Sequence, residues 1–146
     1  MKREKYFWPL SQSHHRALMA AKQVKEQLSS IPQGEESARL CKVSSELKSL
    51  FETELRQHFW DEERLLGLFE ARMGNFDPDV ERIRKDHRLL ESLLAQGKRE
   101  RLLQFAETLV RHVRFEEDEF FGRMEKVFNE ADQKSVLEIL VQSPTL

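Results

Sequence analysis

The chain has 146 residues, of which 34% are charged and 39% hydrophobic, and its formal net charge is -2. This length suits one domain with its own core, and Cys41 as the single cysteine cannot form an internal disulfide. The interleaved charges leave no basic surplus for nucleic acid or a membrane surface, and no apolar run approaches the length of a membrane span. MKREKYFWPL lacks the features of a secretory signal. We therefore expect a cytoplasmic protein that binds neither nucleic acid nor membrane.

Apolar residues recur at helical spacing through nearly the whole chain, and the low glycine and proline counts (5 and 4) also favour helices. The spacing predicts a first helix over 11–29, ended by SSIPQGEES, and a second, long helix over 36–72, ended by MGNFDPD. Asp77 before Pro78 is typical of a helix start, and Gly97 of a helix end. The third and fourth helices are expected over 78–96 and 98–128, and a short last helix over 131–141.

Strand-like alternation is absent from this pattern, so the sequence predicts an all-α protein. Four main helices joined by short turns favour an antiparallel up-down-up-down four-helix bundle, with the short C-terminal helix added to it. We expect a single domain over 1–146, whose core covers about residues 10–128.

Two of the helices carry a histidine four residues before a glutamate, among apolar residues: His58 with Glu62, and His112 with Glu116. Residues four apart lie on one helix face, about 5–6 Å apart at Cβ, so each pair can chelate a metal ion. Imidazole nitrogen with carboxylate oxygen suits iron, manganese or zinc, and one or both carboxylates could bridge two ions. His87 on the third helix, with a histidine from the first, would then add one nitrogen to each ion.

The heights of these residues in the bundle can be compared by counting from the turns. The midpoint of His58 and Glu62 lies about 15 residues before the second turn, and the midpoint of His112 and Glu116 lies about 16 residues after the third turn. At about 1.5 Å per residue we expect the two pairs at nearly the same level. His87 lies about 11 residues from either turn, so we expect it roughly 7 Å away from that level.

On the first helix, His14 and His15 are neighbours, and only one can face inward. The apolar stripe of this helix is formed by Ala17, Leu18, Ala21, Val24 and Leu28. The centre of this stripe lies about 40° from His14 and about 140° from His15 at the helical period. We expect His14 to face the metal site and keep His15 as the alternative.

Four further acidic residues follow the two pairs: Glu63, Glu117, Asp118 and Glu119. We expect them to be solvated or to orient metal-bound imidazoles from outside, as carboxylates next to metal sites commonly do.

The strings SHHRAL, HFWDEERLL, KDHRLL and HVRFEEDEFF, in this order, resemble the hemerythrin-like, HHE cation-binding domains over about residues 10–125. The resemblance implies an antiparallel four-helix bundle that holds two iron ions as a non-haem di-iron centre. The ligands that it implies are His14 (or His15), His58, His87 and His112, with Glu62 and Glu116 as bridging carboxylates.

The sequence departs from the oxygen-carrying hemerythrins of this family, which have HxxxH on the third helix, because the residue four after His87 is Glu91. This pattern is more similar to the di-iron stress and repair proteins and to the iron-sensing domains. We therefore expect a protein that binds or reacts with oxygen, peroxide or nitric oxide, in stress response or iron handling. The alternative is an iron or redox sensor and protein-interaction module whose bundle is ordered by metal.

Overall fold

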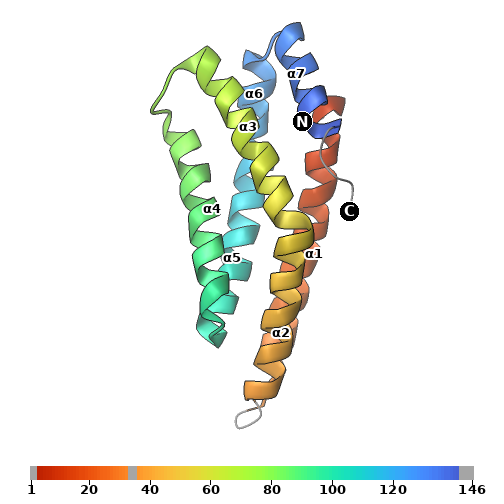
Figure 1. The fold of residues 1–146 in the computed structure, drawn as a ribbon, viewed down its shortest axis with the longest axis vertical. Coiled ribbons are helices and arrows are strands. Elements are labelled where there is room, and N and C mark those ends of the chain that lie inside the picture. Colours follow the sequence, from red (N-terminus) through yellow and green to blue (C-terminus); the bar gives the residue numbers. More distant parts are fainter. Residues whose placement is uncertain (1–2, 33–35, 142–146) are drawn as a thin grey trace.

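The structure is a computed structural model that describes residues 3–32 and 36–141, and every element formed by these residues is helical (Figure 1). The prediction of an all-α fold is confirmed. In chain order the elements are a 3-10 turn η1 (Lys5–Phe7), α1 (Trp8–Ser29), α2 (Glu36–Leu50), η2 (Phe51–Leu55), α3 (Arg56–Met73), α4 (Pro78–Gln96), α5 (Arg99–Phe115), η3 (Glu116–Phe120), α6 (Phe121–Val127) and α7 (Glu130–Val141).

Two short π-helical segments interrupt the α-helical pattern where the sequence predicts unbroken helices. The segment η2 joins α2 to α3, and η3 joins α5 to α6, in both cases without a turn. Each joined set is therefore one continuous helical rod, and the long helices α1 and α4 are rods by themselves. A π turn accommodates an extra residue and rotates the side chains that follow it, and such turns are frequent at functional sites. The segment η3 begins at Glu116, one of the predicted metal-site residues.

The helix ends follow the sequence signals. The side chain of Asp77 accepts hydrogen bonds from the backbone N–H groups of Asp79 and Val80, which caps the N-terminus of α4. Gly97 closes α4 with φ 66°, a left-handed conformation that glycine adopts without strain. These two local signals set the length of α4 on either side of His87.

The rods pack side by side along the long axis of the molecule (Figure 1). Helix α5 packs against α1 and α4, whereas α3 contacts α4, α6 and α7. Short α7 also contacts η1, so it closes the end of the bundle at which the described chain begins. None of the described helices is both long enough and apolar enough to cross a membrane.

Two separate hydrophobic clusters fill the interior. The lower cluster in Figure 1 is formed by Ala17, Ala21, Val24, Leu28, Ile31, Val43, Leu47, Phe51, Leu55, Phe59, Leu90, Leu93, Leu94, Leu102, Phe105, Ala106, Leu109 and Val113. The upper cluster is formed by Tyr6, Phe7, Leu10, Leu65, Leu66, Phe69, Val80, Ile83, Phe115, Phe120, Phe121, Met124, Phe128, Val136, Ile139 and Leu140. Each rod passes from one cluster to the other through buried polar residues, which therefore form a layer between two apolar regions.

The cap residue Asp77 also ties two rods together. Its carboxylate lies 2.7 Å from the Arg123 guanidinium, which reaches Asp79 as well at 2.6 Å. The hydrogen bond from Arg123, together with those from the α4 backbone, holds the pKa of Asp77 below its usual value.

We predict that Asp77→Asn, which keeps a capping oxygen but removes the charge, lowers the free energy of unfolding at pH 7 by about 1 kcal/mol. Because the folded-state pKa is depressed, this stabilisation is fully present above the unfolded value of about 3.9 and is lost as the pH falls through the folded value. The measurement is urea unfolding followed by far-ultraviolet circular dichroism at several pH values. In an Arg123→Met background, Asp77→Asn should lower the free energy of unfolding by a smaller amount. If the wild type stays more stable than Asp77→Asn by the same amount as the pH falls well below about 4, the charge-based explanation is refuted.

Candidate metal centre

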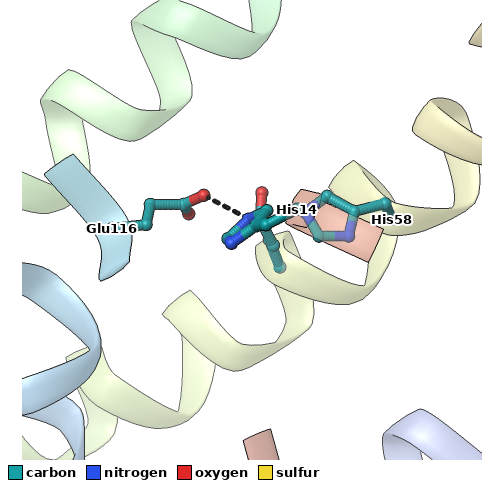
Figure 2. A group of neighbouring side chains, drawn as sticks. His14, His58 and Glu116 are labelled. Atoms are coloured by element: carbon teal, nitrogen blue, oxygen red, sulfur yellow. Dashed lines mark hydrogen bonds and ion pairs between the residues drawn. The ribbon is translucent and has the colours of Figure 1, made fainter. Parts of the chain in front are cut away.

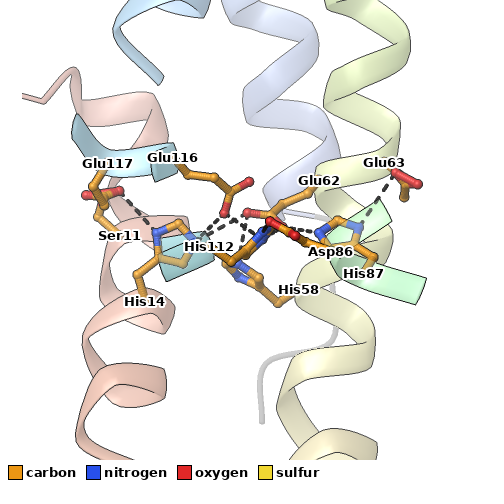
Figure 3. A network of polar contacts seen from close by, with 10 residues as sticks. All are labelled: Ser11, His14, His58, Glu62, Glu63, Asp86, His87, His112, Glu116 and Glu117. Atoms are coloured by element: carbon orange, nitrogen blue, oxygen red, sulfur yellow. Dashed lines mark hydrogen bonds and ion pairs between the residues drawn. The ribbon is translucent and has the colours of Figure 1, made fainter. Parts of the chain in front are cut away.

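All six residues predicted to hold metal lie together in the polar layer between the two hydrophobic clusters (Figure 3). They come from every rod of the bundle, and none is more than 8% exposed. They are His14 of α1, His58 and Glu62 of α3, His87 of α4, His112 of α5 and Glu116 of η3.

The two pairs with helical spacing are in contact as their spacing predicts. His58 Nε2 lies 3.0 Å from Glu62 Oε2, and His112 Nε2 lies 3.0 Å from Glu116 Oε1. Both contacts keep the pair on the inward face of its helix. The π turn that begins at Glu116 does not break the second pair.

Glu62 is the centre of the layer. Its two oxygens contact one imidazole from each of the other three rods: His14 at 3.3 Å, His87 at 2.9 Å and His112 at 3.5 Å. Glu116 joins the same network because its Oε1 lies 3.1 Å from Nε2 of His14 (Figure 2). The two glutamates therefore link all of the rods.

The structure distinguishes the two adjacent histidines of α1. The His14 side chain is buried in the layer, at 2% exposed, and Figure 2 shows it beside His58 and Glu116. His15 is exposed and lines a surface hollow near Trp8 and away from the layer. The choice of His14 from the direction of the apolar stripe agrees with this placement.

His87 lies closer to the other residues than counting from the turns predicts. Its Nε2 is 2.9 Å from Glu62 Oε1, which places it in the layer rather than roughly 7 Å from it. The count assumes parallel helix axes, whereas α3 is inclined to α4 in Figure 1. The expected offset is therefore wrong, and its source is the inclination of the helices.

The donor atoms form two groups that share both carboxylates. One group contains His14 and His58 with Glu62 and Glu116, and the other contains His87 and His112 with the same two glutamates; in each group the ligand atoms lie within 4.8 Å of one another. Each group offers two imidazole nitrogens and two carboxylates. This arrangement can hold metal cations, and its nitrogen and oxygen donors suit iron, manganese or zinc.

Apart from Nδ1 of His87, which lies 3.7 Å from Glu63 outside the layer, three buried atoms of the six residues lack a hydrogen-bond partner among the described residues: Nε2 of His58, Nε2 of His112 and Oε1 of Glu116. Both nitrogens lie 3.0 Å from a carboxylate oxygen, but the angles are not those of a hydrogen bond. A buried polar atom without a partner costs about 1–3 kcal/mol. A cation coordinated by these atoms would remove that cost, so the residues present fit a bound metal.

A carboxylate outside the layer holds His14 from behind. Glu117 Oε2 lies 3.1 Å from His14 Nδ1 and also accepts a hydrogen bond from Ser11 Oγ (Figure 3). A contact at Nδ1 leaves Nε2 directed into the layer, because the carboxylate fixes the tautomer and the ring orientation. Glu117 therefore has the orienting role that the sequence predicts for some of the acidic residues after the pairs, whereas Asp118 and Glu119 are exposed.

His112 has a similar outer carboxylate, because Asp86 Oδ2 lies 3.1 Å from its Nδ1. Glu63 Oε2 lies 3.7 Å from Nδ1 of His87, which is within ion-pair distance but too long for a hydrogen bond. Sequence reasoning missed Asp86. It lies next to His87 in sequence but serves the histidine of the neighbouring helix, so no spacing along one helix could have found it.

The pKa values of the layer residues are shifted by their buried neighbours. Burial by itself lowers the pKa of His14 and of His112, but the neighbouring carboxylates raise both values well above the ordinary one. Burial raises the pKa of Glu62, but the charge of His58 and hydrogen bonds with the surrounding imidazoles hold it well below its usual range. The layer thus attracts positive charge, which protons supply without metal and which a cation would supply in their place.

The chain was also compared with known proteins. No curated protein and no solved structure matched it. A family model described as hemerythrin HHE cation binding domain matches residues 9–124, a range that contains all six residues of the layer. The chain therefore belongs to the hemerythrin HHE cation-binding domain family.

Proposed function

We propose that this protein is a cytoplasmic non-haem di-iron protein that binds or reacts with oxygen, peroxide or nitric oxide, in stress response or iron handling. The single observation that carries this proposal is the pair of four-residue donor groups that share Glu62 and Glu116. Shared carboxylates are what two neighbouring cations need, because each carboxylate has two oxygens.

The proposed roles follow from the two groups. His14 and His58 would hold one iron, His87 and His112 would hold the other, and Glu62 and Glu116, which belong to both groups, would be shared between them. Two nitrogens and two shared carboxylates are fewer donors than an octahedral ion accepts, so the chain leaves positions for a small molecule. A pair of irons, when bound, supplies these open positions and reversible one-electron chemistry. The chain itself orients the imidazoles through outer carboxylates and keeps bulk water away with the two hydrophobic clusters.

We also propose that the bundle is the antiparallel up-down-up-down four-helix arrangement of the family, formed by one domain over 1–146. The course of the rods in Figure 1 supports this arrangement. Since the layer takes donors from every rod, such a bundle lets one short chain surround the metal site.

A reaction or sensing role is favoured over reversible oxygen carriage. The residue four after His87 is Glu91, whose side chain is 62% exposed and lies 4.0 Å from Arg56. Helix α4 therefore supplies one histidine to the layer, where the oxygen-carrying pattern requires two. The site therefore has fewer nitrogen donors than the oxygen-carrying pattern, and carboxylates make up a larger share of its donors.

The second candidate is an iron or redox sensor whose bundle is ordered by metal. Its supporting observation is that the layer joins every rod and separates two clusters, so metal affinity is also folding free energy. Chelation that lowers helicity, in a protein with no turnover of oxygen or peroxide, would favour this candidate. Rapid turnover with retained helicity would favour the first.

The proposed function predicts a metal stoichiometry. Protein reconstituted with ferrous iron without oxygen should hold about two irons per chain, because two donor groups are present. Metal analysis measures the ratio, and exposure to air should give near-ultraviolet charge-transfer bands. Glu116→Ala removes a donor from both groups and should weaken both ions. A ratio of one, or preferential tight binding of zinc or manganese, would contradict the di-iron assignment.

The adjacent histidines of α1 provide a matched pair. His14→Ala should lose much of one metal ion, because its Nε2 belongs to only one donor group. His15→Ala should retain both ions, because the side chain is exposed. Equilibrium dialysis followed by metal analysis distinguishes the variants, and loss of metal from His15→Ala alone would reverse the assignment.

The outer carboxylates should affect affinity without being ligands. Asp86→Asn and Glu117→Gln remove the charge behind His112 and His14, and each should weaken iron binding by about 10- to 100-fold while the stoichiometry stays at about two. Competition with a ferrous chelator measures the change. Asp118→Asn, an exposed neighbour of Glu117, is the control and should bind as the wild type does; equal losses in all three variants would indicate a general charge effect instead.

A further inference from the structure

A cavity of about 450 Å³ lies between α3 and α4, beside the metal layer. Its walls include Phe51, Phe59 and Trp60, and His87 is part of its lining. Arg88 and Glu91 line it near the surface, where Trp60 is 62% exposed. The cavity thus joins solvent to a residue that we assign to the metal centre.

His87 lines this cavity directly, and one aromatic ring, that of Phe59, lies between the cavity and the deeper histidines of the layer. Phe59 is buried, and its ring is stacked on that of His87 with centroids 4.3 Å apart. The same ring lies 5.8 Å from the rings of His58 and His112. Phe59 therefore touches three of the four histidines on one side and lines the cavity on the other, so it forms the inner wall through which a molecule in the cavity would reach the metals.

The charges around the cavity are balanced. Arg56 is held by Glu52 at 2.7 Å and lies 4.0 Å from Glu91, whereas Glu63 lies 3.7 Å from Arg84. The side chains that line the cavity include two arginines and two glutamates, so they add no net charge, and the inner walls are aromatic. The balanced charges attract neither cations nor anions overall, and the aromatic inner walls favour small uncharged molecules, because an ion there would lose its hydration without gaining a polar partner from these rings.

We propose that the cavity between α3 and α4 is the access route by which small uncharged ligands such as nitric oxide, dioxygen and hydrogen peroxide reach the metal layer, with Phe59 as its selective constriction. The proposal rests on the proposed function for the metals, but the route itself is a property of the chain. The proposed route specifies the side of the bundle from which the ligand enters, and it names Phe59 as the residue that limits the rate of entry.

The first test widens the constriction. Nitric oxide is mixed with the ferrous protein in a stopped-flow instrument, and the association rate is read from the nitrosyl absorbance. Phe59→Leu should raise this rate by about tenfold, equivalent to about 1.4 kcal/mol off the barrier. Phe105→Leu is the matched control: it removes the same atoms from the same lower cluster, at a residue that does not line the cavity, and should leave the rate unchanged.

The second test plugs the mouth without altering the core. Glu91→Trp places a bulky ring at the mouth and should slow association by about tenfold. Ser92→Trp places the same ring on an exposed neighbouring residue outside the cavity lining and should not. Far-ultraviolet circular dichroism and metal analysis verify that each variant is folded and loaded. Unchanged rates in both Phe59→Leu and Glu91→Trp would overturn the proposal.

A third measurement needs no metal and separates this proposal from the proposed function. In metal-free protein, dissolved oxygen, which is paramagnetic, should enhance the proton relaxation of the Phe59 and His87 rings more than that of His14, and Glu91→Trp should reduce the difference. This result, together with metal analysis showing that the protein cannot be loaded with iron, would uphold the route and reject the di-iron function. Equal enhancement at all three rings would overturn the route, whatever metal the protein binds.

Discussion

The structure depends on one buried carboxylate, that of Glu62. A charge taken out of water is costly unless it is paired, and here the pairing comes from four imidazoles on four rods. The relative positions of the rods are thereby restricted, because each must present a histidine to the same two oxygens. The pKa of this carboxyl, held well below its usual range, reflects the same concentration of positive charge around it.

The polar layer also explains why the interior is divided. The lower and upper clusters each bury apolar residues from several rods, yet neither extends through the layer of histidines and glutamates. An apolar layer in this place would make one continuous core, so the polar residues have a cost in stability that a purely structural bundle would avoid. Metal binding is the property that accounts for this cost, since coordination satisfies the unpaired atoms of His58, His112 and Glu116.

The surroundings of the layer differ from one side to the other. Carboxylates hydrogen-bonded to His14 and His112 orient these two imidazoles from outside, whereas the ring of Phe59 lines the cavity between α3 and α4. On the opposite side the ring of Phe121, 1% exposed, is stacked on His14 within the upper cluster. The polar layer is thus enclosed by apolar packing on one side and lies close to solvent on the other.

The sequence by itself determined the helices, their ends at Asp77 and Gly97, and the two His–Glu pairs, because helical periodicity and capping depend on residues a few positions apart. The direction of the apolar stripe also selected His14 for the same local reason. Only the tertiary structure brought Asp86 to His112, since the inclination and rotation of packed helices are decided by side chains far apart in sequence. The level of His87 and the cavity beside Phe59 likewise depend on how the rods pack against one another, which no spacing along one helix contains. The π turns were also not indicated by the helical periodicity.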